Sequence, residues 1–127
     1  MEVDEITGAI VTAAIQIHKD IGSGLFESVY EVLLARALYR RGFRVDRQRA
    51  VDFVYDGIAF EHGFRVDLLV QDCVIVELKS LDRVAPVHSK QVLTYLRLMN
   101  LPVGLLLNFG AETMLEGVKR VLNDRPQ

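Results

Sequence analysis

Hydrophobic residues in the first forty positions recur with the period of an α-helix. In residues 4–20 they are spaced three or four apart, and Gly22-Ser23-Gly24 ends the pattern. In residues 26–38 they form one continuous stripe, and Gly42 follows where a C-terminal glycine cap is expected. This stripe consists of Phe26, Val29, Tyr30, Leu33, Leu34, Ala37 and Leu38. The pattern therefore predicts two amphipathic helices.

From Phe43 onward the hydrophobic period changes to two, which is typical of β-strands. Asp56-Gly57 is a turn signal between two strand regions. The expected strands are 43–55, 58–70, 73–79 and the apolar run 103–108, with a helix at 89–99. The tail, 112–122, is expected to be a helix whose last turn could be a strand.

The order α-α-β-β-β-α-β-α predicts an α/β fold with a mixed central sheet flanked by helices. No repeat, low-complexity tract or linker interrupts the chain, so we expect residues 1–127 to form a single domain. Half of the 127 residues are hydrophobic and 25% are charged, which is a globular composition.

The cysteine count and the hydrophobic runs narrow the class of protein further. Cys73 is the single cysteine, which excludes an intramolecular disulfide and a zinc site of several cysteines. The start of the chain is acidic, unlike a signal peptide, and no apolar run approaches the roughly 20 residues of a membrane helix. We therefore expect a cytoplasmic protein with no membrane partner.

Arginines are concentrated in one short segment of an otherwise acidic chain. The net charge of −2 does not favour a nucleic-acid partner. Six arginines nevertheless stand between positions 36 and 49 against one acid, Asp46. These arginines could lie along a phosphate backbone, or they could belong to a solvated helix end and strand edge. Taken alone, the cluster slightly favours the second interpretation. The six are Arg36, Arg40, Arg41, Arg44, Arg47 and Arg49.

The sharpest chemical feature is the apolar strand 74–79, which ends in Glu77 and Lys79. Strand periodicity puts these two side chains on one face, and Asp67 lies inside another apolar strand. Two carboxylates beside a lysine suit a hard cation such as Mg²⁺, which prefers oxygen ligands and keeps several waters. A structural cross-strand pair between the lysine and a carboxylate is an equally good interpretation of these residues alone.

The connection between these two strands decides whether the carboxylates meet. A two-residue turn at Gln71-Asp72 would place Asp67 opposite Val76, with Asp67 and Glu77 on opposite faces of the sheet. A three-residue connection, 71–73, or a bulge would place both on one face. A shared metal ion requires this second register.

Three motifs in order give the chain a family resemblance. Asp67 followed by Glu77-Leu78-Lys79 resembles the signature of PD-(D/E)XK nucleases, although Val66 stands where that name implies proline. Residues 24–30 match the GxxExxY pattern that names one family of this superfamily, and residues 91–95 match a QxxxY motif of related exonucleases. The three motifs occur in the family's order, and together they span nearly the whole chain.

The resemblance implies a restriction-endonuclease-like fold and metal-dependent hydrolysis of phosphodiester bonds in DNA or RNA, with Mg²⁺ or Mn²⁺ as cofactor. It implies nucleic acid, DNA first, as the partner, and it leaves a homodimer or a protein partner open. The metal ligands would be Asp67, Glu77 and the carbonyl of Leu78, and Lys79 would act on the attacking water. Site residues from the helices would be Glu27, which completes the acidic cluster, and Gln91 and Tyr95, which point at it. Tyr95 also lies on an apolar stripe, and Tyr30 is expected to be a core residue. The alternative is a catalytically silent module of the same fold that binds nucleic acid or a protein.

Overall fold

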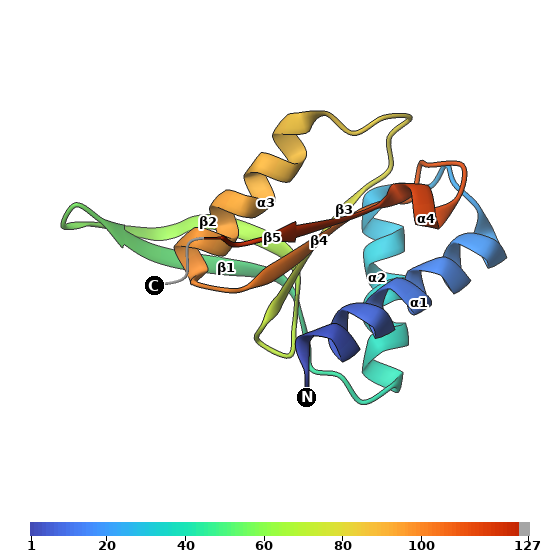
Figure 1. Ribbon diagram of the computed structural model, residues 1–127, viewed down its shortest axis with the longest axis horizontal. Coiled ribbons are helices and arrows are strands. Elements are labelled where there is room, and N and C mark those ends of the chain that lie inside the picture. Colours follow the sequence, from blue (N-terminus) through green and yellow to red (C-terminus); the bar gives the residue numbers. More distant parts are fainter. Residues whose placement is uncertain (125–127) are drawn as a thin grey trace.

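The computed structural model describes residues 1–124 as four helices and five strands (Figure 1). The helices are α1 (Val3–Ile21), α2 (Glu27–Arg40), α3 (Pro86–Met99) and α4 (Met114–Gly117). The strands are β1 (Val45–Tyr55), β2 (Ile58–Val70), β3 (Val74–Lys79), β4 (Val103–Asn108) and β5 (Val118–Leu122). No helix in this described part of the chain is long and apolar enough to cross a membrane.

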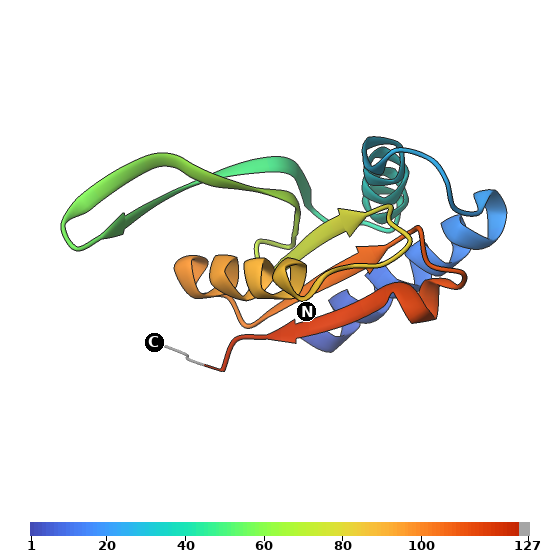
Figure 2. The same cartoon turned by 90° about the horizontal axis from the view of Figure 1, so that it is seen from above.

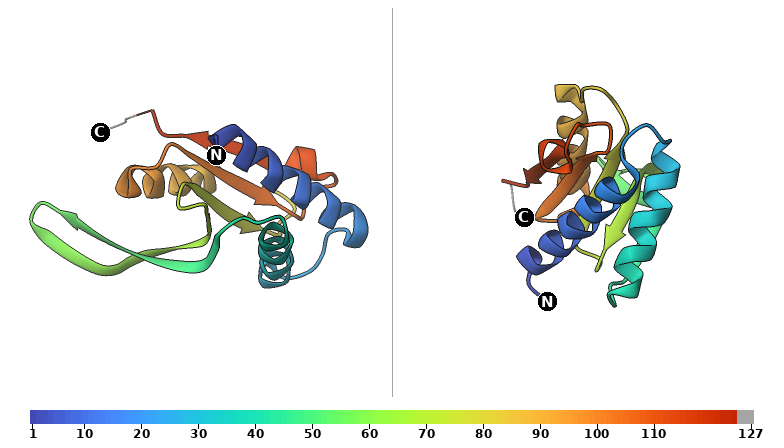
Figure 3. Two further views of the ribbon diagram at one scale, coloured as in Figure 1. Left: turned by 90° about the horizontal axis from the view of Figure 1, so that it is seen from below. Right: turned by 90° about the vertical axis from the view of Figure 1, so that its right-hand side faces the viewer.

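The five strands form one mixed sheet in the order β1-β2-β3-β4-β5. β3 and β4 run parallel, and the other neighbouring pairs are antiparallel. The sheet has a hydrophobic cluster on each face. Val74, Val76 and Leu78 pack with α1 and α2, whereas Ile75 packs with α3. Figure 3 shows α1 and α3 on opposite sides of the strands, so the predicted mixed sheet flanked by helices is confirmed.

β1 and β2 form a long hairpin that extends away from the rest of the sheet (Figure 2). Its turn, Asp56-Gly57, has positive φ at both residues, 51° and 76°, as the two-residue turn predicted there requires. β2 pairs with β3 only through residues 68–70. The outer half of the hairpin therefore has no third strand beside it, and Tyr55 at its end is 72% exposed.

The loop before α2 is held in place by side chains from two directions. The hydroxyl of Tyr30, which is fully buried and stacks on Phe109, donates to the carbonyl of Gly22 at 2.7 Å. The hydroxyl of Ser80, just after β3, donates to the carbonyl of Leu25 at 2.7 Å. These bonds tie the start of α2, at Glu27, to the end of β3. Tyr30 is a core residue, as expected, and it also anchors this loop.

The tail of the chain differs from the expected helix. Only Met114–Gly117 is helical, and Val118–Leu122 is a fifth strand, antiparallel to β4. The helix ends where Gly117 passes so close to β4 that a Cβ atom would lie 2.2 Å from the carbonyl oxygen of Asn108. The strand then pairs with the otherwise open edge of β4, whose backbone groups need partners.

Candidate active site

The register of β2 and β3 brings Asp67 and Glu77 together. Leu68 lies opposite Val76, and Val70 lies opposite Val74, so the strands are joined by the three-residue connection 71–73. This register places Asp67 beside Glu77 at the point where the ladder ends. The structure therefore has the register that a shared site for Asp67 and Glu77 requires.

Beyond Leu68 and Val76, the backbone pairing between β2 and β3 ends, and hydrogen bonds from the two carboxylates join the strands instead. The N–H of Asp67 donates to Oε2 of Glu77 at 2.6 Å, and the N–H of Leu78 donates to Oδ2 of Asp67 at 2.9 Å. Each side chain thus bonds to the backbone of the opposite strand. Because both bonds use backbone donors, the two carboxylates are held in fixed orientations where β2 separates from β3.

The alternation of side chains along β2 breaks at Asp67. Leu68 packs in the cluster under α1 and α2, whereas Val66 and Leu69 both pack in the cluster under α3. Opposite Asp67 in β1, Gln48 has a left-handed backbone with φ of 49°. The outer hairpin is therefore turned relative to its inner end, and this turn brings Phe64 onto α3.

Glu77 is 7% exposed, and burial raises its pKa from the ordinary 4.5 to about 8. The negative charge of Asp67 adds to the rise, with a smaller contribution from Glu31, whereas the hydrogen bond from the Asp67 N–H and the positive charge of Lys79 oppose it. A carboxyl with this pKa holds a proton at neutral pH. Metal ligands must be deprotonated, so a bound cation would take the place of that proton.

Lys79 ends β3 on the same face as Glu77, and its side chain is half-buried. No ion pair of Lys79 is found within residues 1–124, although its charge acts on the pKa of Glu77. Its own carbonyl accepts from the N–H of Phe109 at 2.8 Å, on the β4 side. Because the N–H and C=O of one strand residue point the same way, we expect the carbonyl of Leu78 to face Asp67.

A family model described as the PD-(D/E)XK nuclease superfamily matches residues 4–121. The chain belongs to the PD-(D/E)XK nuclease superfamily. Neither the curated proteins nor the solved structures contain a match to it. The matched region includes α2, α3, α4, all of α1 after its first residue, and the site of Asp67, Glu77 and Lys79.

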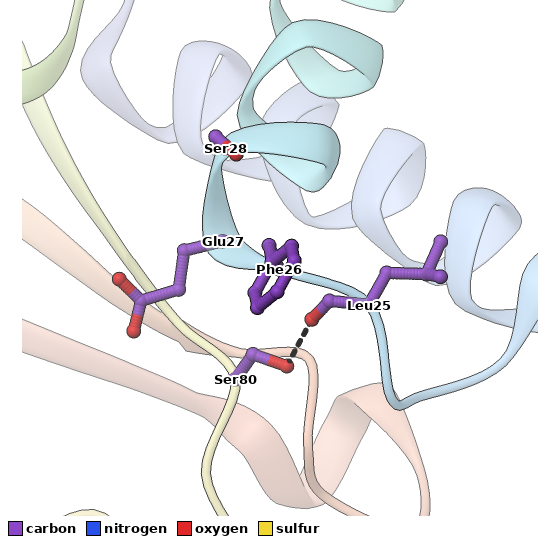
Figure 4. A pocket seen from close by; sticks show the side chains of 5 residues that line it. All are labelled: Leu25, Phe26, Glu27, Ser28 and Ser80. Atoms are coloured by element: carbon purple, nitrogen blue, oxygen red, sulfur yellow. Dashed lines mark hydrogen bonds between the residues drawn. The ribbon is translucent and has the colours of Figure 1, made fainter.

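In this member of the superfamily, Glu27 is the first residue of α2 and lies at the edge of the site. It lines a cavity of about 310 Å³ that also borders Asp67, Glu31 and Gln48. It also lines a neighbouring cavity of about 410 Å³ with Phe26 and Ser80, and Figure 4 shows its side chain extending away from the helix there. The side chain of Glu27 is exposed to solvent.

Glu31 is a buried acid that the sequence interpretation missed. It is 5% exposed, forms an ion pair with Arg47 at 3.1 Å, and accepts a hydrogen bond from the side chain of Gln48. One signal was present in the sequence. Glu31 lies between buried Tyr30 and Leu34 in the hydrophobic stripe of α2, where an unpaired charge is costly.

On α3, Tyr95 is partly buried and packs against the hydrophobic cluster between α3 and the sheet. Its ring stacks on Phe64, with centroids 4.3 Å apart and an interplanar angle of 11°. Burial raises the pKa of Tyr95, and the charges of Glu77 and Asp67 raise it further. Gln91, one turn earlier, has an exposed side chain for which no hydrogen bond is found in the described part of the protein.

The six arginines between positions 36 and 49 of this nuclease-superfamily chain fall into two groups, those that bind protein groups and those that are free of ion pairs within residues 1–124. Four arginines bind protein groups. Arg44 pairs with Asp72, Arg47 with Glu31 and Arg49 with Asp46, and Arg41 donates to the carbonyl of Ala9. Arg36 and Arg40 are exposed on α2, and neither has an ion pair within residues 1–124.

The oxygen donors at this site suit a divalent cation of the magnesium type. Mg²⁺ is commonly held by one or two carboxylates, with water and substrate phosphates completing its shell. Asp67 and Glu77 supply two carboxylates, and the expected direction of the Leu78 carbonyl adds a third oxygen. Among residues 1–124, no three His, Cys, Asp or Glu side chains are close enough to form a metal group by themselves.

Proposed function

We propose that this protein is a metal-dependent nuclease of the GxxExxY group that hydrolyses phosphodiester bonds of DNA, or of RNA, with Mg²⁺ or Mn²⁺. The observation that carries the proposal is the pair of reciprocal hydrogen bonds between Asp67 and the Glu77–Leu78 segment. They fix two acids at one point, with Lys79 on the same face. A purely structural pair would not need a second acid beside Glu77, whose pKa is raised by burial and further by the charge of Asp67.

Each residue has a role that follows from its position. Asp67, Glu77 and the carbonyl of Leu78 would hold the cation, which supplies an activated water and neutralises charge on the phosphate. The ammonium of Lys79 would orient the attacking water. Glu27 would bind a water of the metal shell from the edge of the cavity.

Two further residues on α3 complete the proposed site. The pKa of Tyr95 is raised by burial and further by the charges of Glu77 and Asp67, which supports a hydroxyl near the two acids that would donate to a substrate or water oxygen. Gln91 lies one helical turn away on the same helix, at the distance that puts two side chains on one face. Its amide would contact the nucleic acid.

The proposed substrate surface is the outer face of α2. Arg36 and Arg40 are exposed there, and they point to contact with phosphates more strongly than the four arginines that bind protein groups. We further propose that the chain acts as a single domain in the reducing cytoplasm, consistent with its one half-buried thiol, Cys73.

Cleavage assays with two variants test the proposal. Labelled single-stranded DNA, double-stranded DNA and RNA are incubated with Mg²⁺ or Mn²⁺. Lys79→Ala and Asp67→Asn are expected to reduce cleavage at least about 100-fold, because each removes a group that acts in the transition state. Lys119→Ala and Asp56→Asn, exposed residues on β5 and in the hairpin turn, are the matched controls.

A second candidate is a module of the same fold that binds without cutting. It is favoured by the engagement of Glu31 with Arg47 and Gln48, which leaves two acids rather than three converging on the metal position. Folded wild-type protein that cuts none of the three substrates with either metal ion would support this second function and refute the first.

A further inference from the structure

Gln48 occupies an unusual backbone position inside β1. Its φ of 49° is left-handed, and its neighbours Arg47 and Arg49 pair regularly with Leu68 and Val66 of β2. A left-handed backbone at a residue other than glycine is unfavourable and persists only where the surroundings impose it. Gln48 lies opposite Asp67 in this register, so the strained position is at the proposed metal site.

The side chain of Gln48 bridges two carboxylates. Its amide nitrogen donates to Oε1 of Glu31 at 2.5 Å and lies 3.3 Å from Oδ1 of Asp67, to which it also donates. The other oxygen of Glu31 pairs with Arg47 at 3.1 Å. These contacts form one continuous chain from Arg47 through Glu31 and Gln48 to Asp67.

Both oxygens of Asp67 therefore accept hydrogen bonds from neutral donors. Oδ2 accepts from the N–H of Leu78 at 2.9 Å, and Oδ1 accepts from Gln48. Together the two bonds determine the rotation of the carboxylate. The amide does this without adding a charge, and its two hydrogens let it bond to Glu31 and Asp67 at once, where the two acids would otherwise repel each other.

We propose that Gln48 is a positioning residue that orients the Asp67 carboxylate for cation binding, an inference that rests on the proposed function. Hydrogen-bonding partners of metal ligands orient those ligands, and losing such a partner reduces metal affinity about 10- to 100-fold. In this proposal, the left-handed backbone of Gln48 directs its side-chain amide between Glu31 and Asp67.

Two substitutions separate orientation from stability. Gln48→Ala removes the amide and keeps the unfavourable backbone, whereas Gln48→Gly removes the amide and relieves the backbone. The glycine variant is therefore expected to melt at a higher temperature than the alanine variant. Both are expected to lose affinity for Mn²⁺ about 10- to 100-fold, because both lack the donor to Asp67.

Gln71 provides a matched control in the same fold. It is also a glutamine with a left-handed backbone, φ 54°, and its side chain also makes a hydrogen bond, accepting from the N–H of Arg44 at 2.6 Å. It lies in the connection between β2 and β3, outside the cavity at Asp67. Gln71→Ala and Gln71→Gly are expected to change the melting temperature while leaving Mn²⁺ affinity unchanged.

Isothermal titration with Mn²⁺ and thermal unfolding of all five proteins give the readouts. A loss of affinity in both Gln48 variants, irrespective of their melting temperatures, supports the positioning role. Wild-type affinity in either Gln48 variant, or affinity that simply follows melting temperature across the series, overturns it. Wild-type protein that binds no Mn²⁺ overturns the proposed metal site and this inference together, whereas a failure confined to Gln48 leaves the metal site standing.

Discussion

The buried carboxyl of Glu77 makes the stability of this protein depend on pH. Its pKa rises from the ordinary 4.5 to about 8, because burial and the charge of Asp67 disfavour the ionised form. Between these values the folded chain keeps a proton that the unfolded chain has released, so the stability contributed by Glu77 falls as pH rises. This contribution is fully present below the unfolded value and is lost as pH passes the folded value.

Glu77→Gln replaces the acid by an uncharged amide of similar shape. The difference between 8 and 4.5, at about 1.36 kcal/mol per pKa unit, corresponds to roughly 5 kcal/mol over the whole window. Between about pH 5.5 and about pH 8.5, roughly 3 kcal/mol of this difference is expressed. The variant is therefore expected to gain about that much stability relative to wild type as the pH is raised over this range.

The assay is urea unfolding of both proteins at the two pH values in the presence of a chelator. Glu112→Gln, which removes an exposed acid after β4, is the control and should follow wild type. Addition of Mn²⁺ at the higher pH should stabilise wild type by mass action and leave Glu77→Gln nearly unchanged. A stability difference between wild type and Glu77→Gln that stays constant with pH would contradict the inference that burial holds a proton on this residue.

Two further predictions concern the surface of α2 and the turn into β5. Arg36→Glu combined with Arg40→Glu should weaken nucleic-acid binding and lower the slope of log affinity against log salt by about 1 per lost phosphate contact, measured by fluorescence anisotropy. Lys19→Glu with Lys119→Glu, which makes the same charge change elsewhere, should not alter that slope. Gly117→Ala should destabilise the fold by about 1–3 kcal/mol in urea unfolding, since its Cβ would collide with the carbonyl of Asn108. Gly8→Ala, where a Cβ would meet open space, should show no such loss.

Local sequence patterns are enough to predict which kinds of elements form and which residues carry the chemistry. Helical and strand periods are local properties, so the two N-terminal helices, the hairpin turn at Asp56-Gly57 and the order of the first four strands follow from them. Two acids and a lysine inside apolar strands are also visible in the local sequence, because burying a charged side chain without a partner costs free energy. Strand periodicity also gives the register that a shared metal ion would require, namely a three-residue connection between the strands of Asp67 and Glu77.

Whether that condition is met, and which residues surround the two acids, depends on how distant parts of the chain pack together. The register follows from which apolar residues pack on each face of the sheet, and that packing involves α1, α2 and α3 together. Gln48 reaches both Glu31 and Asp67, 17 and 19 residues away along the chain, so no local pattern indicates the contact. The tail became a strand for the same reason. Its own residues allowed either state, and the open backbone edge of β4 is present only in the folded sheet.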